Sequence, residues 1–460
     1  MGTAGNFNEQ VAQATVGTVP QVFANPMKNL ISPRVGFAWD PTKTGNWAIR
    51  GGVGVYHDWV VMGQSVDQTR LNPPGVANEQ FFEGGNGAQP IFALAPSGTY
   101  PFNFPLPVGT VGSLNAAGGI TGANPPSVDS LDRNMKAPLA VNYVIGVEHQ
   151  LPWRLVAGAN YSGSRSYNGL DGTDVNRFPG GAVVTPATGS TAATEAINRL
   201  NPNFAAITYV NNANQATYNA AIFFLRGKAG SRGSFQTSYT LAHAKDYPEA
   251  GTRFDQDGGL SIPDQSAYFS YYGDANYDVR QRFSFSGSYI LPGYKSGIAS
   301  ILTSGWEAST IIAVQTGTPF WVYNTLPADG GGDYNRDGND WDVPNTPTQD
   351  FTGSHSRSAY INGLFTAADF PAPAVGTEGN ERRNIYRNPG MFQADASVLK
   401  NNRIPWIGEQ GNLQLRFDFI NVLNHGNLGP VDANMADGTF GESITALPAR
   451  SLQFGLRVSF

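Results

Sequence analysis

Several features are missing from this 460-residue chain, and each absence excludes a class of fold, site or partner. It has no cysteine, which excludes a disulfide scaffold and cysteine-based zinc or iron–sulfur sites. It has no run of about 18 apolar residues, so no helix is expected to cross a membrane. Charged residues make up only 14 %, against about 25 % in ordinary soluble proteins. The net charge is −6 and no basic stripe occurs, so nucleic acid is not an expected partner.

Catalytic motifs are absent as well. No Gly-x-Ser-x-Gly elbow occurs, and the histidines are not spaced for one metal site on a shared face (His57, His149, His243, His355 and His425). The glycine-rich residues 51–54 lie inside a strand-like pattern, where glycine marks a bulge or bend rather than a phosphate loop. We therefore expect no enzyme activity and no required cofactor.

The clearest positive signal is the carboxy-terminal segment. Apolar side chains alternate with polar or small ones up to the last residue (Leu452, Phe454, Leu456, Val458 and Phe460 against Gln453, Gly455, Arg457 and Ser459). A strict period of two predicts a β-strand with one apolar face. Such a strand suits either the end of a soluble β-sandwich or a membrane barrel whose apolar face meets lipid and whose last aromatic side chain lies at the headgroups.

Alternation recurs along the whole chain. Counting the last strand, eleven segments are predicted to be strands: 33–40, 46–59, 139–150, 154–165, 218–229, 233–245, 278–291, 305–323, 390–403, 412–423 and 450–460. Polar side chains on the second face, such as Arg282, Arg416 and Asp418, would line a lumen or contact a plug.

The connections between these segments alternate strictly in length. The short ones are 41–45, 151–153, 230–232, 292–304 and 404–411; the long ones are 60–138, 166–217, 246–277, 324–389 and 424–448. In an up-and-down sheet all long connections then lie at one end. Long unstructured loops argue against a compact soluble domain, and this asymmetry is typical of outer-membrane barrels. We predict an all-β, antiparallel up-and-down transmembrane β-barrel with long extracellular loops and short periplasmic turns.

Aromatic residues are placed as two interfacial belts would be. One set lies near the short turns (Trp47, Trp153, Tyr294, Trp306, Trp406 and Phe460), and the other near the long loops (Trp59, Tyr167, Tyr247, Tyr277, Trp321 and Tyr323). The alternative is that aromatic residues simply favour strands.

The odd number of strands predicts that part of the barrel is missing. The last strand is expected to run inward, so the first does too, and residues 1–32 look like the end of an outer loop. Closing eleven strands would pair the first and last in parallel, which bacterial single-chain barrels avoid. We therefore expect about half of a barrel upstream, together with the signal peptide, which residues 1–8 do not resemble.

Several stretches resemble the TonB-dependent receptor family. Residues 29–40 (NLISPRVGFAWD) and 48–58 (AIRGGVGVYHD) resemble a mid-barrel hairpin, with the Oar-like branch, which has a carboxypeptidase-regulatory-like domain, most similar. Residues 277–283 resemble the start of a later strand and 413–425 the penultimate strand. Residues 450–460 resemble the signal read by the barrel-insertion machinery. Together these motifs span nearly the whole chain.

The resemblance implies a 22-stranded barrel with a plugged lumen in the bacterial outer membrane, of which residues 33–460 are the carboxy-terminal part. It also implies four partners: outer-membrane lipid, the protein's own plug and amino-terminal half-barrel, the TonB system acting through that plug, and an extracellular ligand taken up from the loops. No plug, TonB-interaction box or regulatory-like domain is visible in this sequence. The alternatives are a surface adhesion or structural protein without transport, and a soluble secreted β-protein.

One acidic segment raises the question of a calcium site. Asp333, Asn335 and Asp337 occupy alternate positions before Gly338, as in the first half of an EF-hand-type loop. The twelfth position is Pro344 instead of glutamate, so the remaining oxygen ligands would come from Asp340 and Asp342. The segment is either a Ca²⁺ site in an outer loop or a solvated turn rich in Asp and Asn.

Overall fold

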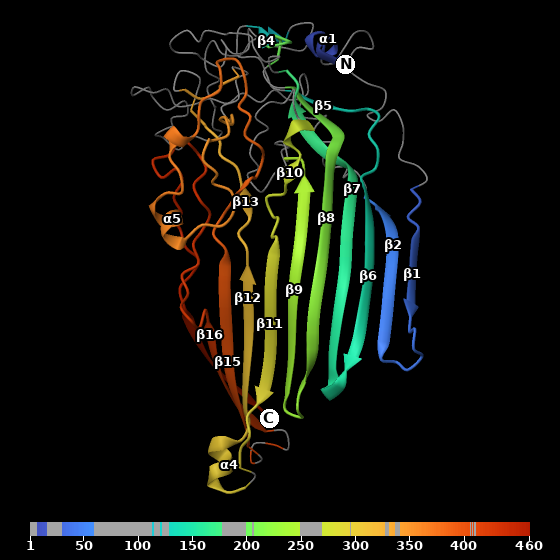
Figure 1. The fold of residues 1–460 in the computed structure, drawn as a ribbon, viewed down its shortest axis with the longest axis vertical. Coiled ribbons are helices and arrows are strands. Elements are labelled where there is room, and N and C mark those ends of the chain that lie inside the picture. The colour runs from blue at the N-terminus through green and yellow to red at the C-terminus, as the bar shows by residue number, and fades with distance from the viewer. Residues whose placement is uncertain are drawn as a thin grey trace, which may run out of the picture.

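A computed structural model describes residues 7–15, 30–58, 113–114, 120–121, 128–176, 199–204, 207–248, 269–294, 296–326, 331–335, 341–404, 406, 408 and 411–460. One large sheet dominates the described part of the chain (Figure 1). Eleven strands follow one another across it: β1 (Arg34–Trp39), β2 (Trp47–His57), β6 (Leu139–Leu151), β7 (Leu155–Asp174), β8 (Ile207–Ala229), β9 (Gly233–Asp246), β11 (Gln281–Ile290), β12 (Trp306–Gln315), β15 (Met391–Arg403), β16 (Asn412–Ile420) and β17 (Ser451–Ser459).

The remaining elements are short. β5 (Val128–Leu131) and β10 (Gly273–Asp274) join the large sheet beside β8 and β9, while β3 (Ser113–Leu114) pairs with β4 (Ile120–Thr121) and β13 (Pro319–Phe320) with β14 (Tyr386–Arg387). The α-helices are α1 (Phe7–Ala12), α4 (Ile298–Thr303) and α5 (Arg357–Asn362), and the 3-10 turns are Pro152–Arg154 and Ala367–Asp369. None of the helices described is both long and apolar enough to cross a membrane.

The eleven strands run alternately up and down, and every neighbouring pair is antiparallel. The short connections gather at one end of the sheet, the turn end, and the long ones at the other, the loop end (Figure 1). The predicted all-β up-and-down fold, with its eleven strands and its lopsided connections, is confirmed.

The first hairpin shows how local chemistry sets a turn. The Asp40 carboxylate accepts hydrogen bonds from the backbone amides of Thr42 (3.0 Å) and Gly45 (2.7 Å). Gly45 has a φ of 77°, a left-handed conformation that glycine adopts at little cost. The aspartate and the glycine together reverse the chain between β1 and β2.

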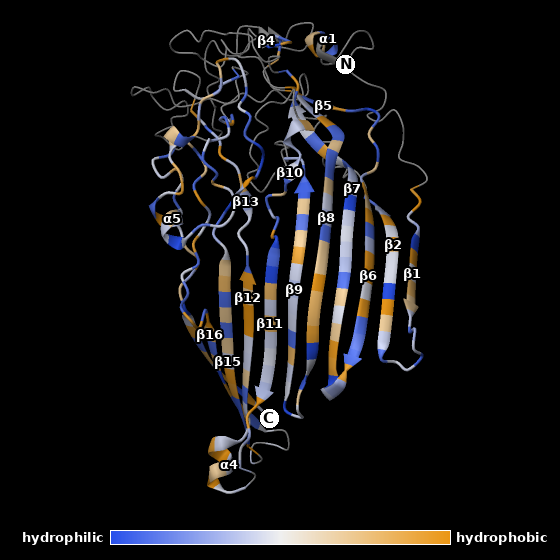
Figure 2. Ribbon diagram, in the orientation of Figure 1, coloured by the Kyte–Doolittle hydropathy of each residue, from blue (hydrophilic) through white to orange (hydrophobic). Residues whose placement is uncertain are grey.

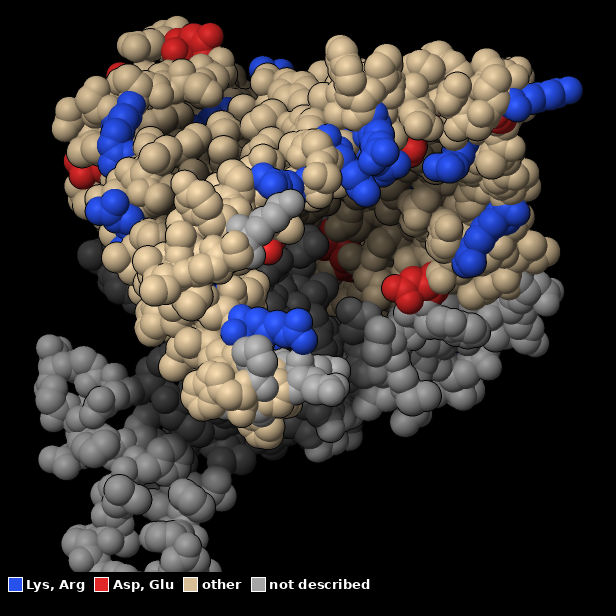
Figure 3. All heavy atoms as spheres, turned by 90° about the horizontal axis from the view of Figure 1, so that it is seen from below, with Lys and Arg blue, Asp and Glu red and all other residues tan. Residues whose placement is uncertain are grey.

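The two faces of the sheet differ in chemistry. Directly opposed residues of neighbouring strands share a face, and one face, here called the apolar face, carries the alternating large side chains, such as Phe37, Tyr143 and Phe283. Val35 and Leu452, on the two edge strands, are 72 % and 69 % exposed. Figure 2 shows the alternation as bands along the strands, and Figure 3 shows a hollow at the turn end bordered by acidic and basic side chains.

Buried apolar side chains cluster at the loop end. In the described part of the chain, three clusters of buried apolar residues form there, and none covers the apolar face of the sheet. One of them joins Val11 of α1 to Phe204 and Ile207, and Asn201 fixes it by donating from Nδ2 to the backbone oxygens of Val11 and Ala14. The sheet therefore exposes its apolar residues, while the loops bury theirs.

Three strand ends differ from the sequence prediction by eight residues or more. The part of the sheet in which all eleven strands pair is called the strand wall, or the wall. β7 extends to Asp174 and β8 begins at Ile207, because these two strands keep pairing beyond the wall, through an Asn-rich stretch with two register shifts. Asparagine has low strand propensity, so the pattern gave no sign of this extension. β12 ends at Gln315 instead of residue 323, because the chain leaves the large sheet there and residues 319–320 pair with β14 in a separate two-stranded sheet.

Candidate functional site

The long connections between β12 and β15 and between β16 and β17 build a core of their own. Nine buried residues form this loop cluster: Phe320, Val322, Phe351, Tyr360, Leu364, Phe365, Phe370, Tyr386 and Val431. Phe365 lies at its centre, with ring centroids 5.0–6.2 Å from those of five neighbours (Phe320, Phe351, Phe370, Tyr386 and Phe440). The two connections are thus held as one layer above the strands.

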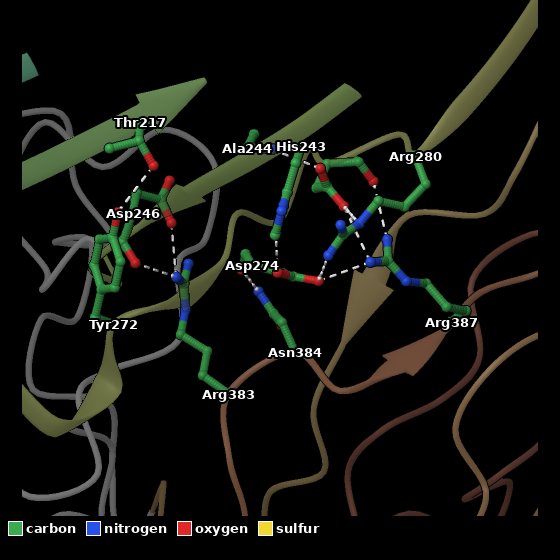
Figure 4. A network of polar contacts seen from close by, with 11 residues as sticks. Thr217, His243, Ala244, Asp246, Tyr272, Asp274, Arg280, Arg383, Asn384 and Arg387 are labelled. Atoms are coloured by element: carbon green, nitrogen blue, oxygen red, sulfur yellow. Dashed lines mark hydrogen bonds and ion pairs between the residues drawn. The ribbon is translucent and has the colours of Figure 1, made fainter. Parts of the chain in front are cut away.

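An ionic network fastens this layer to β9, β10 and β11 (Figure 4). Arg387 Nη2 lies 2.7 Å from Asp274 Oδ2 and 3.0 Å from Asp278 Oδ2. Arg280 contacts the same two carboxylates, at 2.7 Å through Nη2 and 2.8 Å through Nε. The Asp278 side chain is fully buried, so its charge depends on these two guanidinium groups and on the Ala244 amide that donates to Oδ1 (2.7 Å).

A second pair of contacts continues the network. Buried Arg383 donates from Nη1 to the carboxylate (2.6 Å) and the backbone oxygen (2.9 Å) of Asp246. Next to it, Asn384 donates from Nδ2 to the backbone oxygen of Asp274 (2.6 Å) and to Asn276 (2.7 Å). The charges of the three arginines balance those of the three aspartates, so the network joins distant segments without a net charge (Arg280, Arg383 and Arg387 with Asp246, Asp274 and Asp278).

His243 adds a titratable partner to Asp274, with Nε2 2.8 Å from Oδ1. Partial burial raises the pKa of the Asp274 carboxyl, but hydrogen bonds from His243 and Arg280 outweigh it and hold that pKa below its usual value of 3.8. The aspartate is therefore ionised across the physiological pH range, and its negative charge attracts both Arg280 and Arg387 throughout that range.

A buried carboxyl lies inside the loop layer. Glu381 is 4 % exposed, and its Oε1 accepts a hydrogen bond from the Val322 amide at 3.4 Å. Burial raises the pKa of Glu381 well above its ordinary value of 4.5. Burial and the neighbouring Glu381 also raise the pKa of Tyr386.

The polar face of the sheet carries its own ion pairs. Glu148 on β6 contacts Arg226 on β8 (2.9 Å) and Arg50 on β2 (3.5 Å), so its charge spans the intervening strand β7. Arg416 contacts Asp418 at 2.8 Å on β16. Arg282 lies on the same face, opposite Gln315, so the three polar residues predicted to line a lumen share one face.

The proposed calcium ligands are described only in part. Asp333, Asn335 and Asp342 are buried, and Asp342 Oδ2 accepts a hydrogen bond from the Asn335 amide (3.2 Å). Asp337 and Asp340 lie outside the described residues. Among the residues described, no group of three or more His, Asp or Glu is arranged to hold a metal ion. The Ca²⁺ site stays a prediction.

Two aromatic residues differ from their predicted places in the outer belt. Trp321, assigned to the outer aromatic belt, is 3 % exposed and packs on Tyr271 and Val343. Tyr323 stacks on Trp341 and pairs with Asn434 in an isolated bridge. Trp321 and Tyr323 both follow the end of β12 and so belong to the loop layer instead of the large sheet. Trp59, assigned to the same belt, lies outside the described residues.

The ionic network was not predicted. Its members come from segments more than 100 residues apart in sequence, such as Asp274 and Arg387. The only signal was local charge density: residues 278–282 and 381–387 each concentrate charges in a chain that is otherwise poor in them.

A family model described as outer membrane beta barrel domain matches residues 2–453. No curated protein matches the chain.

Solved structures that resemble the chain include the outer membrane transporter YddB from Escherichia coli, at 10 % identity and a TM-score of 0.46, with 92 % of this chain and 40 % of that one covered. The siderophore receptor PiuA from Acinetobacter baumannii is 11 % identical, with a TM-score of 0.40, and the match covers 92 % of this chain and 35 % of that one. The FrpB iron transporter from Neisseria meningitidis is 12 % identical, with a TM-score of 0.40, and the match covers 92 % of this chain and 38 % of that one. The chain thus spans two fifths or less of the length of each of these proteins.

Proposed function

This chain belongs to the family of outer membrane beta-barrel domains and lies in the outer membrane, and we propose that it is the carboxy-terminal part of a TonB-dependent receptor of the Oar-like type. In this role the apolar face contacts lipid, the polar face borders the lumen, and the loop layer faces the medium and meets the ligand. The chain then contributes binding and passage and no covalent chemistry.

The observation that carries the proposal is the direction of the two edge strands. In the described sheet, β1 and β17 each pair on one side only. Ten successive antiparallel pairings make them run in the same direction. An antiparallel barrel can close only when an odd number of further strands is inserted between these edges, which gives an even total.

A second copy does not supply those strands. Two copies inserted in the same orientation bring β17 of one beside β1 of the other in parallel, which the antiparallel pattern does not allow. The remaining strands must therefore come from a segment of different sequence. A barrel wider than eleven strands encloses more space than its own side chains fill, and this favours a plugged transporter.

The loop layer supports the ligand-binding role. Its aromatic core and its ionic network hold two long connections in one arrangement, as a pre-organised binding surface requires. Charged pairs such as Glu148–Arg226 on the other side of the wall suit a hydrated or plug-contacting lumen.

The proposal is tested on the protein as the cell makes it. An affinity tag inserted beside Val375, which is 67 % exposed in a loop, allows extraction from outer membranes. We expect a polypeptide larger than the 49.1 kDa of this chain, retained on an immobilised carboxy-terminal domain of TonB. A homogeneous, heat-modifiable 49.1-kDa barrel that TonB does not retain would contradict the receptor proposal and favour the adhesion role.

A further inference from the structure

The apolar face of the sheet carries very few charges. Along the paired stretches of its eleven strands, up to the register shifts beyond Ser166 of β7, only three of the residues on this face are Lys, Arg, Asp or Glu: Arg165 on β7, Lys245 on β9 and Lys400 on β15. All three are cations. A charge on a surface that faces hydrocarbon is costly, so each needs a reason to be there.

The charge of Lys400 is satisfied by groups of the protein itself. It lies at the turn end, where its Nζ donates to the backbone oxygens of Ile301 (2.7 Å) and Ser304 (2.9 Å) and lies 5.0 Å from the Trp306 ring. Arg165 and Lys245 lie at the loop end instead. No ion pair joins either of them to a carboxylate in the part of the chain that the structure describes.

These two cations lie in one register row. Arg165 is directly opposite Thr217 of β8, and Thr217 is directly opposite Lys245. Because neighbouring strands are about 4.8 Å apart, the two cationic residues lie about 10 Å apart on the same face. Between them, the Thr217 hydroxyl lies 2.9 Å from the hydroxyl of Tyr272 (Figure 4), so two hydroxyls separate the two positive charges.

The height of this row on the wall corresponds to the lipid headgroups. Two residues nearer the turn end, the hydroxyls of Tyr143 and Tyr161 both donate to Asn219 Oδ1, at 2.7 and 2.8 Å, which marks an aromatic girdle. The cations lie one strand repeat, about 7 Å, beyond the level of Asn219. Arg165 leans further the same way, with its guanidinium 5.2 Å from the Tyr167 ring.

We propose that Arg165 and Lys245, with the two hydroxyls between them, bind the phosphate of an anionic lipid headgroup in the outer leaflet. A guanidinium, an ammonium and hydroxyl donors are the groups that bind phosphate oxygens in proteins. The lipid source is favoured over a soluble phosphate because the apolar face continues directly below the row, through residues such as Phe223 and Leu241, where acyl chains would lie.

The carboxylates that the structure describes near this row do not cancel its charge. Asp246, next to Lys245 in the chain, contacts Arg383. Asp274 is directly opposite Lys245, but its oxygens already contact His243, Arg280 and Arg387. Counting Arg165, Lys245, Arg280, Arg383 and Arg387 against Asp246, Asp274 and Asp278 leaves two positive charges. The field at the row therefore attracts an anion.

The test is native mass spectrometry of the protein extracted from outer membranes in a non-ionic detergent and titrated with phosphatidylglycerol, phosphatidylcholine or inorganic phosphate. We expect phosphatidylglycerol to bind preferentially, and the double variant R165A/K245A to bind it at least about tenfold more weakly, since two charge-assisted contacts are lost. The matched control R282A/K228A removes the same charge from the polar face and should bind like the native protein.

Two further comparisons separate loss of the site from loss of the fold. The charge-preserving variant R165K/K245R should keep most of the preference, and all variants should show the same heat-modifiable migration. Equal binding by R165A/K245A and native protein would overturn the proposal, as would equal weakening in the R282A/K228A control. Binding of inorganic phosphate with no preference for the anionic lipid would overturn the lipid assignment.

Discussion

The strand wall and the loop layer use the same apolar residue types in opposite ways. Phe454 on β17 is 60 % exposed and lies beside the ring of Phe417, whereas Phe365 in the loop cluster is 3 % exposed and contacts five aromatic rings. Burying a phenylalanine is worth about 1.5–3 kcal/mol. The loop layer obtains this stabilisation from its own side chains, while the wall obtains it only from an apolar solvent. The chain therefore has one part whose apolar side chains need a membrane and another part whose apolar side chains are buried within the protein and are stable in water.

The largest expected effect breaks the loop side of this comparison. Phe365→Ala removes the ring at the centre of the loop cluster and should lower the local stability of the layer by about 3–5 kcal/mol. Hydrogen exchange measures this at the Leu364 and Ser443 amides, which donate to Gly441 and Tyr360 across the layer. Phe454→Ala, on the wall, should leave the exchange of these amides unchanged. Equal exchange in both variants would contradict the account.

The next effect tests how the layer is fastened to the wall. Asp278→Asn keeps the shape of the side chain but leaves Arg280 and Arg387 without one of their carboxylates, which should cost about 3 kcal/mol because the site is buried. Limited proteolysis should then cut within residues 316–390. The matched variant Asp418→Asn breaks a more exposed pair with Arg416 and should cost much less stability, because water screens that pair. Similar losses in both variants would refute a special role for the network.

The smallest effect concerns pH. Because the folded-state pKa of Glu381 is raised, its contribution to stability is fully present below its unfolded value of 4.5 and is lost as pH rises through the folded pKa. Glu381→Gln should remove this dependence and stabilise the loop layer by about 1–3 kcal/mol at pH 8. Exchange of the Val322 amide, measured between pH 5 and about pH 9, reports the difference. The same slope with pH in both proteins would show that Glu381 does not control it.

The low pKa of Asp274 acts in the opposite direction. Its contribution is present above the unfolded value of 3.8 and is lost as pH falls through the folded pKa. The two carboxyls are therefore distinguishable by the end of the pH range at which each weakens the layer.

The sequence revealed the wall better than the layer for a physical reason. A strand between lipid and lumen alternates every second residue, so segments such as residues 278–291 could be located from side-chain type alone. Where β8 continues beyond the wall through an Asn-rich stretch, no apolar face is required and the pattern fails. The extent of pairing there is set by the partner strand, which local sequence does not report.

The candidate site depends even more on tertiary contacts. Asp274 and Arg387 meet across 113 residues of sequence, and neither lies in a recognisable motif. The Asp- and Asn-rich segment at residues 333–342 had the stronger local signal, yet sequence order alone could not show that Asp342 is buried beside Asn335. Loop sites of this kind are determined by which long connections pack together.

The central claim is that the apolar face of the wall touches hydrocarbon, and spin labels on β11 test it most directly. The chain has no cysteine, so single cysteines at Phe283, Ser284, Phe285 and Ser286 give unique labels. In outer membranes we expect residues 283 and 285 to collide mainly with dissolved oxygen, which concentrates in lipid, and residues 284 and 286 mainly with a water-soluble nickel complex. Four labels shielded from both reagents, or no alternation between neighbours, would contradict the claim.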